Sequence, residues 1–282
     1  MSIKKTAIVI YNKIPSNLKN ALGKLNWLKP LRDQLFRSNG NYKEVEALIK
    51  RTYQTYTVEF KFLASFQVSA KATKRGIESK LLNNSILLLK MYQSHTDDLM
   101  VLDVGANFGF LSLVWANTIA KNGQIIAFEP NMHLFSTLKK SVKLNGLQNK
   151  MLIKNNAVGA EDRTIEMYMG NTTSNVMTIN DAKGVQPIEM ITLDTFSVQT
   201  RLNKCNLLKI DVDGIELEIL HGATQLIKQF RPVIIIETND DRRIVDYMKQ
   251  LNYTLLDMDL NTLRETDTLP LNVFCVANEA YL

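Results

Sequence analysis

The stretch that decides the fold is VLDVGANFGFLSLVWA, which runs from Val101 to Ala116. Two apolar runs flank a turn that contains glycine, a pattern that predicts a buried strand, a tight turn and a helix. Many α/β proteins open their nucleotide sites with such a unit. The turn departs from the dinucleotide fingerprint G-x-G-x-x-G, because Gly105 and Gly109 are separated by three residues and Asp103 precedes them. The turn therefore predicts a ligand site of a different kind.

From residue 99 onward, strand and helix patterns alternate along the chain. The predicted strands are residues 100–104, 124–128, 151–156, 164–169, 189–193, 207–212, 233–237, 254–258 and 273–277. Apolar stripes at helical spacing predict helices after the turn, after Asn131, over 215–230 and over 240–251. This order is typical of an α/β doubly wound, Rossmann-like sheet of about seven strands, mostly parallel, with helices on both faces.

The first 98 residues predict a mostly helical, irregular N-terminal appendage. The patterns indicate a helix over 41–56, a hairpin or strand pair over 56–70 and a helix over 77–92. We therefore divide the chain into this appendage, residues 1–98, and a main domain, residues 99–282. The appendage would serve acceptor recognition or oligomerisation, and a homodimer is compatible with this division.

Composition favours a globular protein of the cytoplasm. Apolar residues make up 45% of the chain and charged residues 22%, which is ordinary for such proteins. No apolar run reaches the ~18 residues of a membrane span, and no small-residue cleavage site follows the short apolar run near the start. Cys205 and Cys275 stand far apart without metal-ligand spacing, so we expect buried thiols in a reducing compartment.

The net charge of +6 is unevenly distributed. Residues 1–100 contain 17 Lys and Arg against 7 Asp and Glu, whereas residues 101–282 contain 17 against 21. The basic half could meet an anionic partner, such as a membrane surface, a phosphorylated substrate or a nucleic acid. The scattered charges are equally compatible with an ordinary solvated surface.

Acids dominate the ends of the predicted strands, where doubly wound sheets bind their ligands. Asp103, Glu129, Asp211 and Glu237 each end or follow a strand, and Asn156 follows another. Such a field repels a pyrophosphate unless a metal intervenes. It suits S-adenosylmethionine, which carries an ammonium and a sulfonium group and no phosphate.

Each residue at these strand ends has an expected role toward S-adenosylmethionine. Gly105 lets the backbone approach the ligand, Gly109 opens the following helix, and Asp103 attracts the methionyl ammonium. Glu129 can accept hydrogen bonds from both ribose hydroxyls, and the segment after the third strand meets the adenine edge. The predicted cofactor-binding residues are Glu78, Asp103, Gly105, Asn107, Gly109, Glu129, Asn156 and Ala157.

Six segments together resemble one known family. They are VLDVGANFGFLSL (101–113), IIAFEPNMHLFSTLKKSVKLNG (125–146), NNAVG (155–159), ITLDTF (191–196), LLKIDVDGIELEILHGA (207–223) and PVIIIE (232–237). In this order they resemble the FkbM-type S-adenosylmethionine-dependent methyltransferases. The resemblance implies a class I methyltransferase fold with an antiparallel last strand, and O-methylation of a hydroxyl on a sugar, glycan or secondary metabolite, as in polysaccharide biosynthesis. Where the family usually has KIDVEG, this chain has KIDVDG, which shortens the reach of Asp213.

A sugar hydroxyl is a poor nucleophile, so a base or a metal should help to remove its proton. Asp211 is the first candidate base and Asp213 the second. With Glu237 these acids could instead gather Mg²⁺, although their spacing does not require it and we expect no metal. His221 is interpreted as a packing residue, and Asp194 as a turn or helix cap.

Three other functions remain as alternatives. A nucleic-acid methyltransferase would explain the basic half, but DVDG at 211–214 lacks the prolines and the aromatic residue of the motif that such enzymes carry there, so we expect no nucleic-acid partner. A non-catalytic nucleotide-binding protein predicts an eroded acidic site, yet the acids are present. A dehydrogenase conflicts with the glycine spacing. The acceptor is left open, and the polar loop 170–187 and residues 1–98 are expected to select it.

Overall fold

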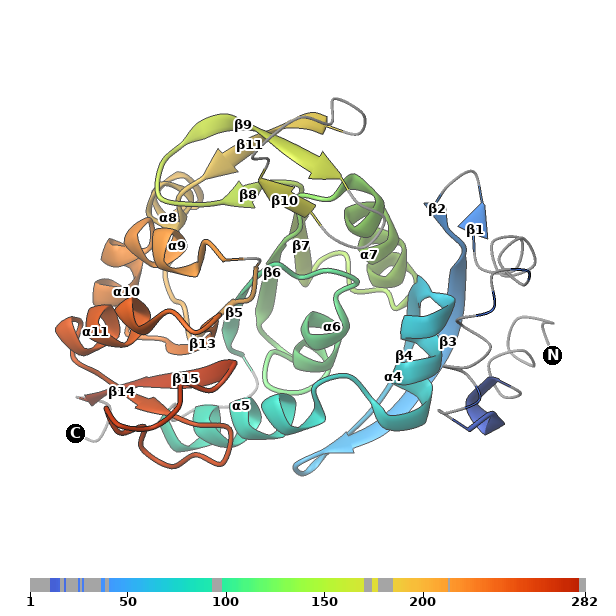
Figure 1. The fold of residues 1–282 in the computed structure, drawn as a ribbon, viewed down its shortest axis with the longest axis horizontal. Helices are drawn as coiled ribbons and strands as arrows, with labels where there is room; N and C mark the ends of the chain where they lie inside the picture. The colour runs from blue at the N-terminus through green and yellow to red at the C-terminus, as the bar shows by residue number, and fades with distance from the viewer. Residues whose placement is uncertain are drawn as a thin grey trace.

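The computed structural model describes residues 11–15, 18, 25, 27, 37–38, 41–92, 98–169, 174–176, 185–212 and 214–278. A seven-stranded sheet in the order β14-β15-β13-β12-β5-β6-β7 forms its centre (Figure 1). The strands are β5 (Met100–Val104), β6 (Gln124–Phe128), β7 (Met151–Lys154), β12 (Leu207–Ile210), β13 (Val233–Glu237), β14 (Tyr253–Leu256) and β15 (Asn272–Ala277). β15 runs in the direction opposite to the other six strands of this sheet. The predicted class I methyltransferase sheet is confirmed.

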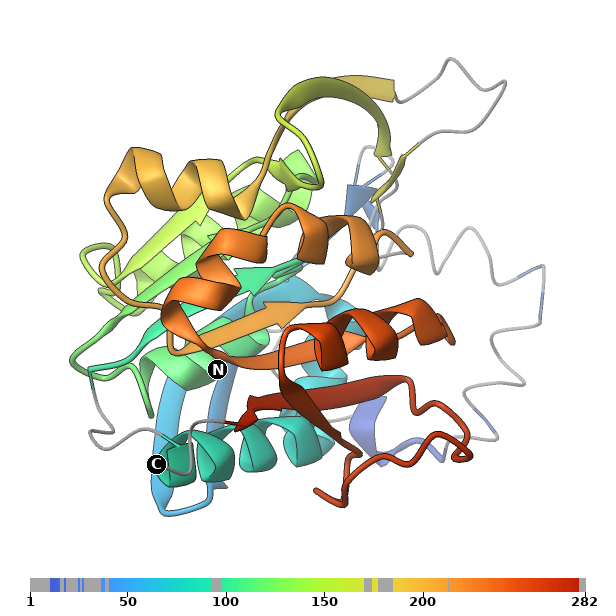
Figure 2. The same cartoon turned by 90° about the vertical axis from the view of Figure 1, so that its left-hand side faces the viewer.

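Helices cover both faces of this sheet. They are α5 (Ser79–Tyr92), α6 (Phe110–Ala116), α7 (Met132–Leu144), α8 (Leu193–Thr200), α9 (Glu216–His221), α10 (Thr224–Phe230) and α11 (Arg242–Gln250). A further helix, α4 (Phe66–Arg75), packs on the segment that precedes the sheet. Successive strand residues enter opposite cores, since Val101 packs with α5, α6 and α7 while Leu102 packs with α8 to α11. Figure 2 shows α5 on one side of the red and orange strands and the orange helices on the other.

The segment before the sheet contains a long hairpin, β3 (Glu44–Tyr53) and β4 (Tyr56–Ser65), followed by α4 and α5. The helix predicted over 41–56 is therefore wrong, and so is the expectation that this part of the appendage is mostly helical. Val45, Ala47 and Ile49 alternate toward the core with the period of a strand, and pairing with β4 outweighs the helix propensity of the Glu, Lys and Leu residues between them. The helix predicted over 77–92 is confirmed as α5.

The helix predicted over 215–230 is divided into α9 and α10 at Gly222. A side chain there would overlap the backbone carbonyl oxygen of Gly159, so the chain passes close to a neighbouring loop at this point. The break allows both short helices to follow the sheet surface.

Two predicted strands belong to a second, smaller sheet in the order β10-β9-β11-β8. Its strands are β8 (Ala157–Val158), β9 (Arg163–Met169), β10 (Ser174–Val176) and β11 (Val185–Ile191). Most of the polar loop 170–187 lies outside the described residues. The two-residue strands β1 (Arg37–Ser38) and β2 (Asn41–Tyr42) pair separately. Within the described ranges, no helix combines the length and the apolar character of a membrane span.

Candidate functional site

The glycine turn between β5 and α6 is shaped by two close approaches. Gly105 has φ +74°, and a Cβ at this position would overlap the backbone carbonyl oxygen of Asp211. Gly109 has φ +75°, caps α6, and would overlap the side chain of Leu138 if it carried a Cβ. Positive φ and contact with backbone both require glycine at residue 105. The turn thus lies directly against the end of β12.

Glu129 follows β6 and is buried, with both carboxylate oxygens held by backbone N–H groups. Asn107 N–H donates to Oε2 at 2.7 Å, and Asn131 N–H donates to Oε1 at 2.9 Å. Burial raises the pKa of Glu129 to about 7, although these hydrogen bonds and the nearby Lys209 oppose the shift. One carboxylate therefore ties the glycine turn to the end of the neighbouring strand.

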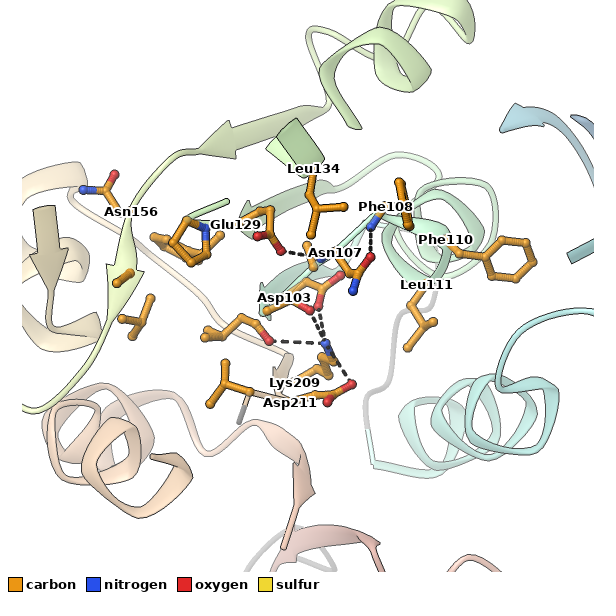
Figure 3. A pocket seen from close by; sticks show the side chains of 18 of the residues that line it. Asp103, Asn107, Phe108, Phe110, Leu111, Glu129, Leu134, Asn156, Lys209 and Asp211 are labelled. Atoms are coloured by element: carbon orange, nitrogen blue, oxygen red, sulfur yellow. Dashed lines mark hydrogen bonds and ion pairs between the residues drawn. The ribbon is translucent and has the colours of Figure 1, made fainter. Parts of the chain in front are cut away.

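A buried lysine lies beneath the turn (Figure 3). Lys209 Nζ donates to the carbonyl oxygens of Gly105 at 2.8 Å and Val104 at 3.2 Å. It also forms ion pairs with Asp103 Oδ1 at 3.2 Å and Asp211 Oδ2 at 3.3 Å. Burial alone would lower the pKa of Lys209, but the two carboxylates outweigh burial and raise it. Lys209 thus joins two strand ends and the turn through one charge.

Asp103 lies at the centre of this cluster. Its side chain is only 1% exposed, and its Oδ2 accepts a hydrogen bond from the Ser112 hydroxyl. Lys209 already provides its positive partner, because the two residues are directly paired across β5 and β12. The predicted attraction of a ligand ammonium to Asp103 would therefore act beside an existing cation.

The turn and the strand ends form the wall of a cavity of about 570 Å³, a size within the usual range for small-molecule sites. The predicted site residues that line it are Glu78, Asp103, Gly105, Asn107, Glu129, Asn156, Ala157 and Asp211. The lining contains the carboxyls of Glu78, Asp103, Glu129 and Asp211 and the ammonium groups of Lys71 and Lys209. With all six ionised, the acids leave a net charge of −2.

Glu78 reaches the cavity from the N-terminal segment. It has φ +46° and immediately precedes α5. The residue is exposed, but partial burial of its carboxyl and the nearby Asp211 raise its pKa. The hairpin and α4 add Phe62, Val68 and Lys71 to the same wall. The cavity therefore has one side built by the sheet and another built by the segment before it.

Two residues considered for the site, Gly109 and Glu237, do not belong to the cavity wall, and a third, Asp213, is not described. Gly109 does not line the cavity and acts through helix packing. Asp213 lies outside the described residues, so neither its role as a base nor the Mg²⁺ site with Glu237 is tested. Glu237 ends β13 and is not part of the cavity lining.

His221 and Asp194 have structural roles. The His221 ring packs against Tyr247 with the ring centroids 4.5 Å apart, as predicted. Asp194 lies in the first turn of α8, and its carboxylate accepts from the N–H groups of Gln225 and Leu226 at 2.9 and 2.8 Å. It therefore caps α10 rather than its own helix.

Two residues of the site were not predicted. Lys209 lies within an apolar strand, and only the register of β12 against β5 reveals its partner Asp103. Asn155 donates to the carbonyl oxygens of Glu129 at 2.9 Å and Pro130 at 2.8 Å, which holds the loop after β6. The sequence does place Lys209 within an apolar strand. Because a buried charge requires partners, this lysine could have indicated that acidic groups lie nearby.

Comparison with known proteins gives the family. The model of the methyltransferase FkbM domain matches residues 103–255, more than half of the chain. The chain belongs to the FkbM methyltransferase domain family. A curated relative, Methyltransferase 1 of Beauveria bassiana, is 26% identical over 170 residues, which cover 52% of this chain and 68% of that protein.

Two solved structures are similar to this chain at low identity. The methyltransferase FkbM of Methylobacillus flagellatus has a TM-score of 0.44 and 11% identity, with 74% of this chain and 65% of that chain covered. A methyltransferase of Geobacter sulfurreducens has a TM-score of 0.43 and 10% identity, with 74% of this chain and 84% of that chain covered. This chain thus spans less than two thirds of the length of the first structure.

Proposed function

We propose that this FkbM-family methyltransferase transfers the methyl group of S-adenosylmethionine to a hydroxyl of a sugar, glycan or secondary metabolite. The observation that carries the proposal is Glu129. Its buried carboxylate stands at the end of the second strand and already fixes the glycine turn through Asn107 N–H. A carboxylate in this place accepts hydrogen bonds from ribose hydroxyls in nucleotide-binding folds.

The residues of the cavity fit this cofactor in shape and charge. Gly105 lines the cavity and, without a side chain, lets the turn lie against the backbone of Asp211. The acidic excess of the lining favours a cation over a phosphate. Glu129 would hold the ribose, and Asn156 and Ala157 would meet the adenine. When bound, S-adenosylmethionine supplies a methyl carbon activated by the sulfonium.

Asp211 is the proposed base for the acceptor hydroxyl. It lines the cavity, its side chain is 33% exposed, and Oδ2 lies 3.3 Å from Lys209 Nζ. The lysine keeps Asp211 oriented at the strand end, and the exposed part of the carboxylate can accept a proton from the acceptor. Most of the rest of the rate enhancement would come from holding the acceptor oxygen in line with the methyl carbon and the sulfur.

The acceptor side of the cavity is proposed to be the wall contributed by the N-terminal segment. Phe62, Val68 and Ile77 present apolar surface and Lys71 a cation. An acceptor with an apolar face and an anionic group would match this wall. This assignment supports the expected role of residues 1–98 in acceptor recognition.

Calorimetric titration with S-adenosylhomocysteine tests the proposal. The wild-type protein should bind S-adenosylhomocysteine and should not bind NAD⁺. The Glu129→Ala variant should no longer bind S-adenosylhomocysteine. Glu166→Ala, which removes an exposed acid on β9, serves as the matched control and should bind normally. Binding of NAD⁺ alone would refute the cofactor assignment. A screen of glycan and metabolite hydroxyls for methyl incorporation from S-adenosylmethionine would then test O-methylation.

A further inference from the structure

A second pocket, of about 560 Å³, lies where the end of β3 meets the junction of α4 and α5. Its wall contains the cations Lys50, Arg51 and Arg75, the hydroxyls of Tyr53 and Ser79, and two threonines. No carboxylate belongs to this wall, although Lys50 forms an exposed ion pair with Glu59 at 3.3 Å. The pocket shares no residue with the cofactor cavity. The wall of this pocket is therefore positively charged, whereas the lining of the cofactor cavity has an excess of acids.

The Tyr53 hydroxyl is buried there without a hydrogen-bond partner in the described part of the chain. The residue is 1% exposed. Burial raises the pKa of Tyr53, while the Arg51 charge and a weak hydrogen-bonding approach of the Ser79 hydroxyl lower it. That approach does not amount to a hydrogen bond of normal geometry. A buried donor with no acceptor is costly, and an acceptor atom in the pocket would remove that cost.

The groups around the phenol are fixed in place. Arg51 Nε and Nη2 donate to the carbonyl oxygens of Ala72 at 3.2 Å and Thr73 at 2.9 Å. Gly76 has φ +79°, and a Cβ built there would lie 2.6 Å from Ser79 Oγ and 3.3 Å from Arg51 Nε. The glycine therefore lets the α4–α5 turn close around these two side chains.

The start of α5 adds to the positive field of the pocket. Ser79 is its first residue, the helix has 14 residues, and its first turn contains no acidic side chain. The first N–H groups of a helix carry partial positive charge and bind anions readily. Arg75, in the last turn of α4, brings a second guanidinium to the same place.

We propose that this pocket binds a phosphate group. Phosphate oxygens would accept from the Tyr53 and Ser79 hydroxyls, and the guanidinium groups of Arg51 and Arg75 would balance their charge. The phosphate could be free, on a soluble ester or on a lipid headgroup, and all three present the same oxygens. Every residue of the pocket wall belongs to residues 1–100, the part of the sequence with the basic excess.

Thermal unfolding with and without phosphate tests the proposal on the full chain. Inorganic phosphate should raise the Tm of the wild type beyond sodium chloride of equal ionic strength. Tyr53→Phe should raise the Tm without phosphate, since it removes the unpartnered hydroxyl, and should weaken phosphate binding about tenfold. Arg75→Ala should also weaken it. Lys139→Ala, an exposed lysine of α7, should behave as wild type.

Further probes identify the source of the phosphate. Uridine 5′-diphosphate tests a soluble ester, and phosphatidylcholine vesicles with and without phosphatidic acid test a lipid. Binding by any of these that is lost in Tyr53→Phe and Arg75→Ala supports the site and names its source. No binding of any probe, or equal binding by all variants, overturns it. Titration with S-adenosylhomocysteine should be unchanged in both variants, so failure here leaves the cofactor assignment standing.

Discussion

At the scale of single residues, Glu129 makes the protein sensitive to pH. Its pKa is about 7 in the fold against 4.5 ordinarily, so between these values the folded chain holds a proton that the unfolded chain releases. The contribution of Glu129 to the free energy of unfolding should therefore be level below pH 4.5, fall as the pH rises to about 7, and then stay level. The shift corresponds to a loss of ~3 kcal/mol.

Denaturant unfolding over roughly pH 4 to 8 checks this expectation. Glu129→Gln carries no titratable group at the position, so its unfolding free energy should lack the fall seen in the wild type. In the wild type, S-adenosylhomocysteine should bind more tightly as the pH rises through 7, because the ionised carboxylate is the better acceptor for ribose hydroxyls. If the unfolding free energies of wild type and variant changed with pH in parallel, the assignment of the fall to Glu129 would be wrong. A wild-type affinity for S-adenosylhomocysteine that did not change through pH 7 would contradict the second expectation.

Lys209 is the second decisive residue. Removal of one partner from a buried ion pair leaves the other charge uncompensated and costs about 3–5 kcal/mol. Lys209→Met should lose about this much unfolding free energy in urea. Lys204→Met is the matched control, because its ion pair with Asp98 is exposed and should contribute about 0–1 kcal/mol. Equal losses in the two variants would show that the buried charges carry no special stability.

Position in the chain was sufficient to predict Glu129 but not Lys209. Glu129 follows four consecutive apolar residues, 125–128, and precedes a proline, a pattern visible locally. The role of Lys209 depends on pairing with a residue more than a hundred positions earlier, and no local pattern contains that register. Asp103 was also predicted at the site, from its place just before the glycine turn. Its ion-pair partner Lys209 was not predicted.

At the scale of elements, the glycine turn depends on one close contact. Gly105→Ala should abolish S-adenosylhomocysteine binding and destabilise the fold, because the added Cβ meets the rigid backbone of Asp211. Gly146→Ala has a similar φ of +66° but no atom within 4 Å, so it should lose only ~1 kcal/mol and bind normally. Calorimetric titration compares them. Retained binding in Gly105→Ala would mean that the turn can shift.

The elements differ in how well local patterns predict them. β5, β6 and α7 were predicted closely, since each has an apolar run or stripe with a turn signal at its end. The hairpin strand β3 was not, because helix-forming residues alternate with apolar ones and the partner strand decides the outcome. At Gly222, where α9 ends, the chain passes close to the distant Gly159, and no helical stripe records this contact.

At the scale of the whole molecule, the predicted boundary between residues 98 and 99 remains to be tested. One core contains Phe60 and Phe62 of the hairpin, Leu82 and Ile86 of α5, and Trp115 of α6. The Trp115 indole N–H donates to Ser85 Oγ at 3.0 Å within it. A fragment of residues 99–282 would expose the apolar face that α5 and the hairpin cover, which is a large share of the stabilising burial.

We therefore expect the full chain to unfold in one cooperative step and the 99–282 fragment to lack fixed tertiary packing. Near-ultraviolet circular dichroism and binding of an apolar dye distinguish the two, since a loosely packed fragment keeps its helices but loses the aromatic signal. Trp115→Phe in the full chain is the control for the signal of that ring. A fragment that unfolds cooperatively and binds S-adenosylhomocysteine would establish an independent catalytic domain. In that case residues 1–98 would act on the acceptor alone.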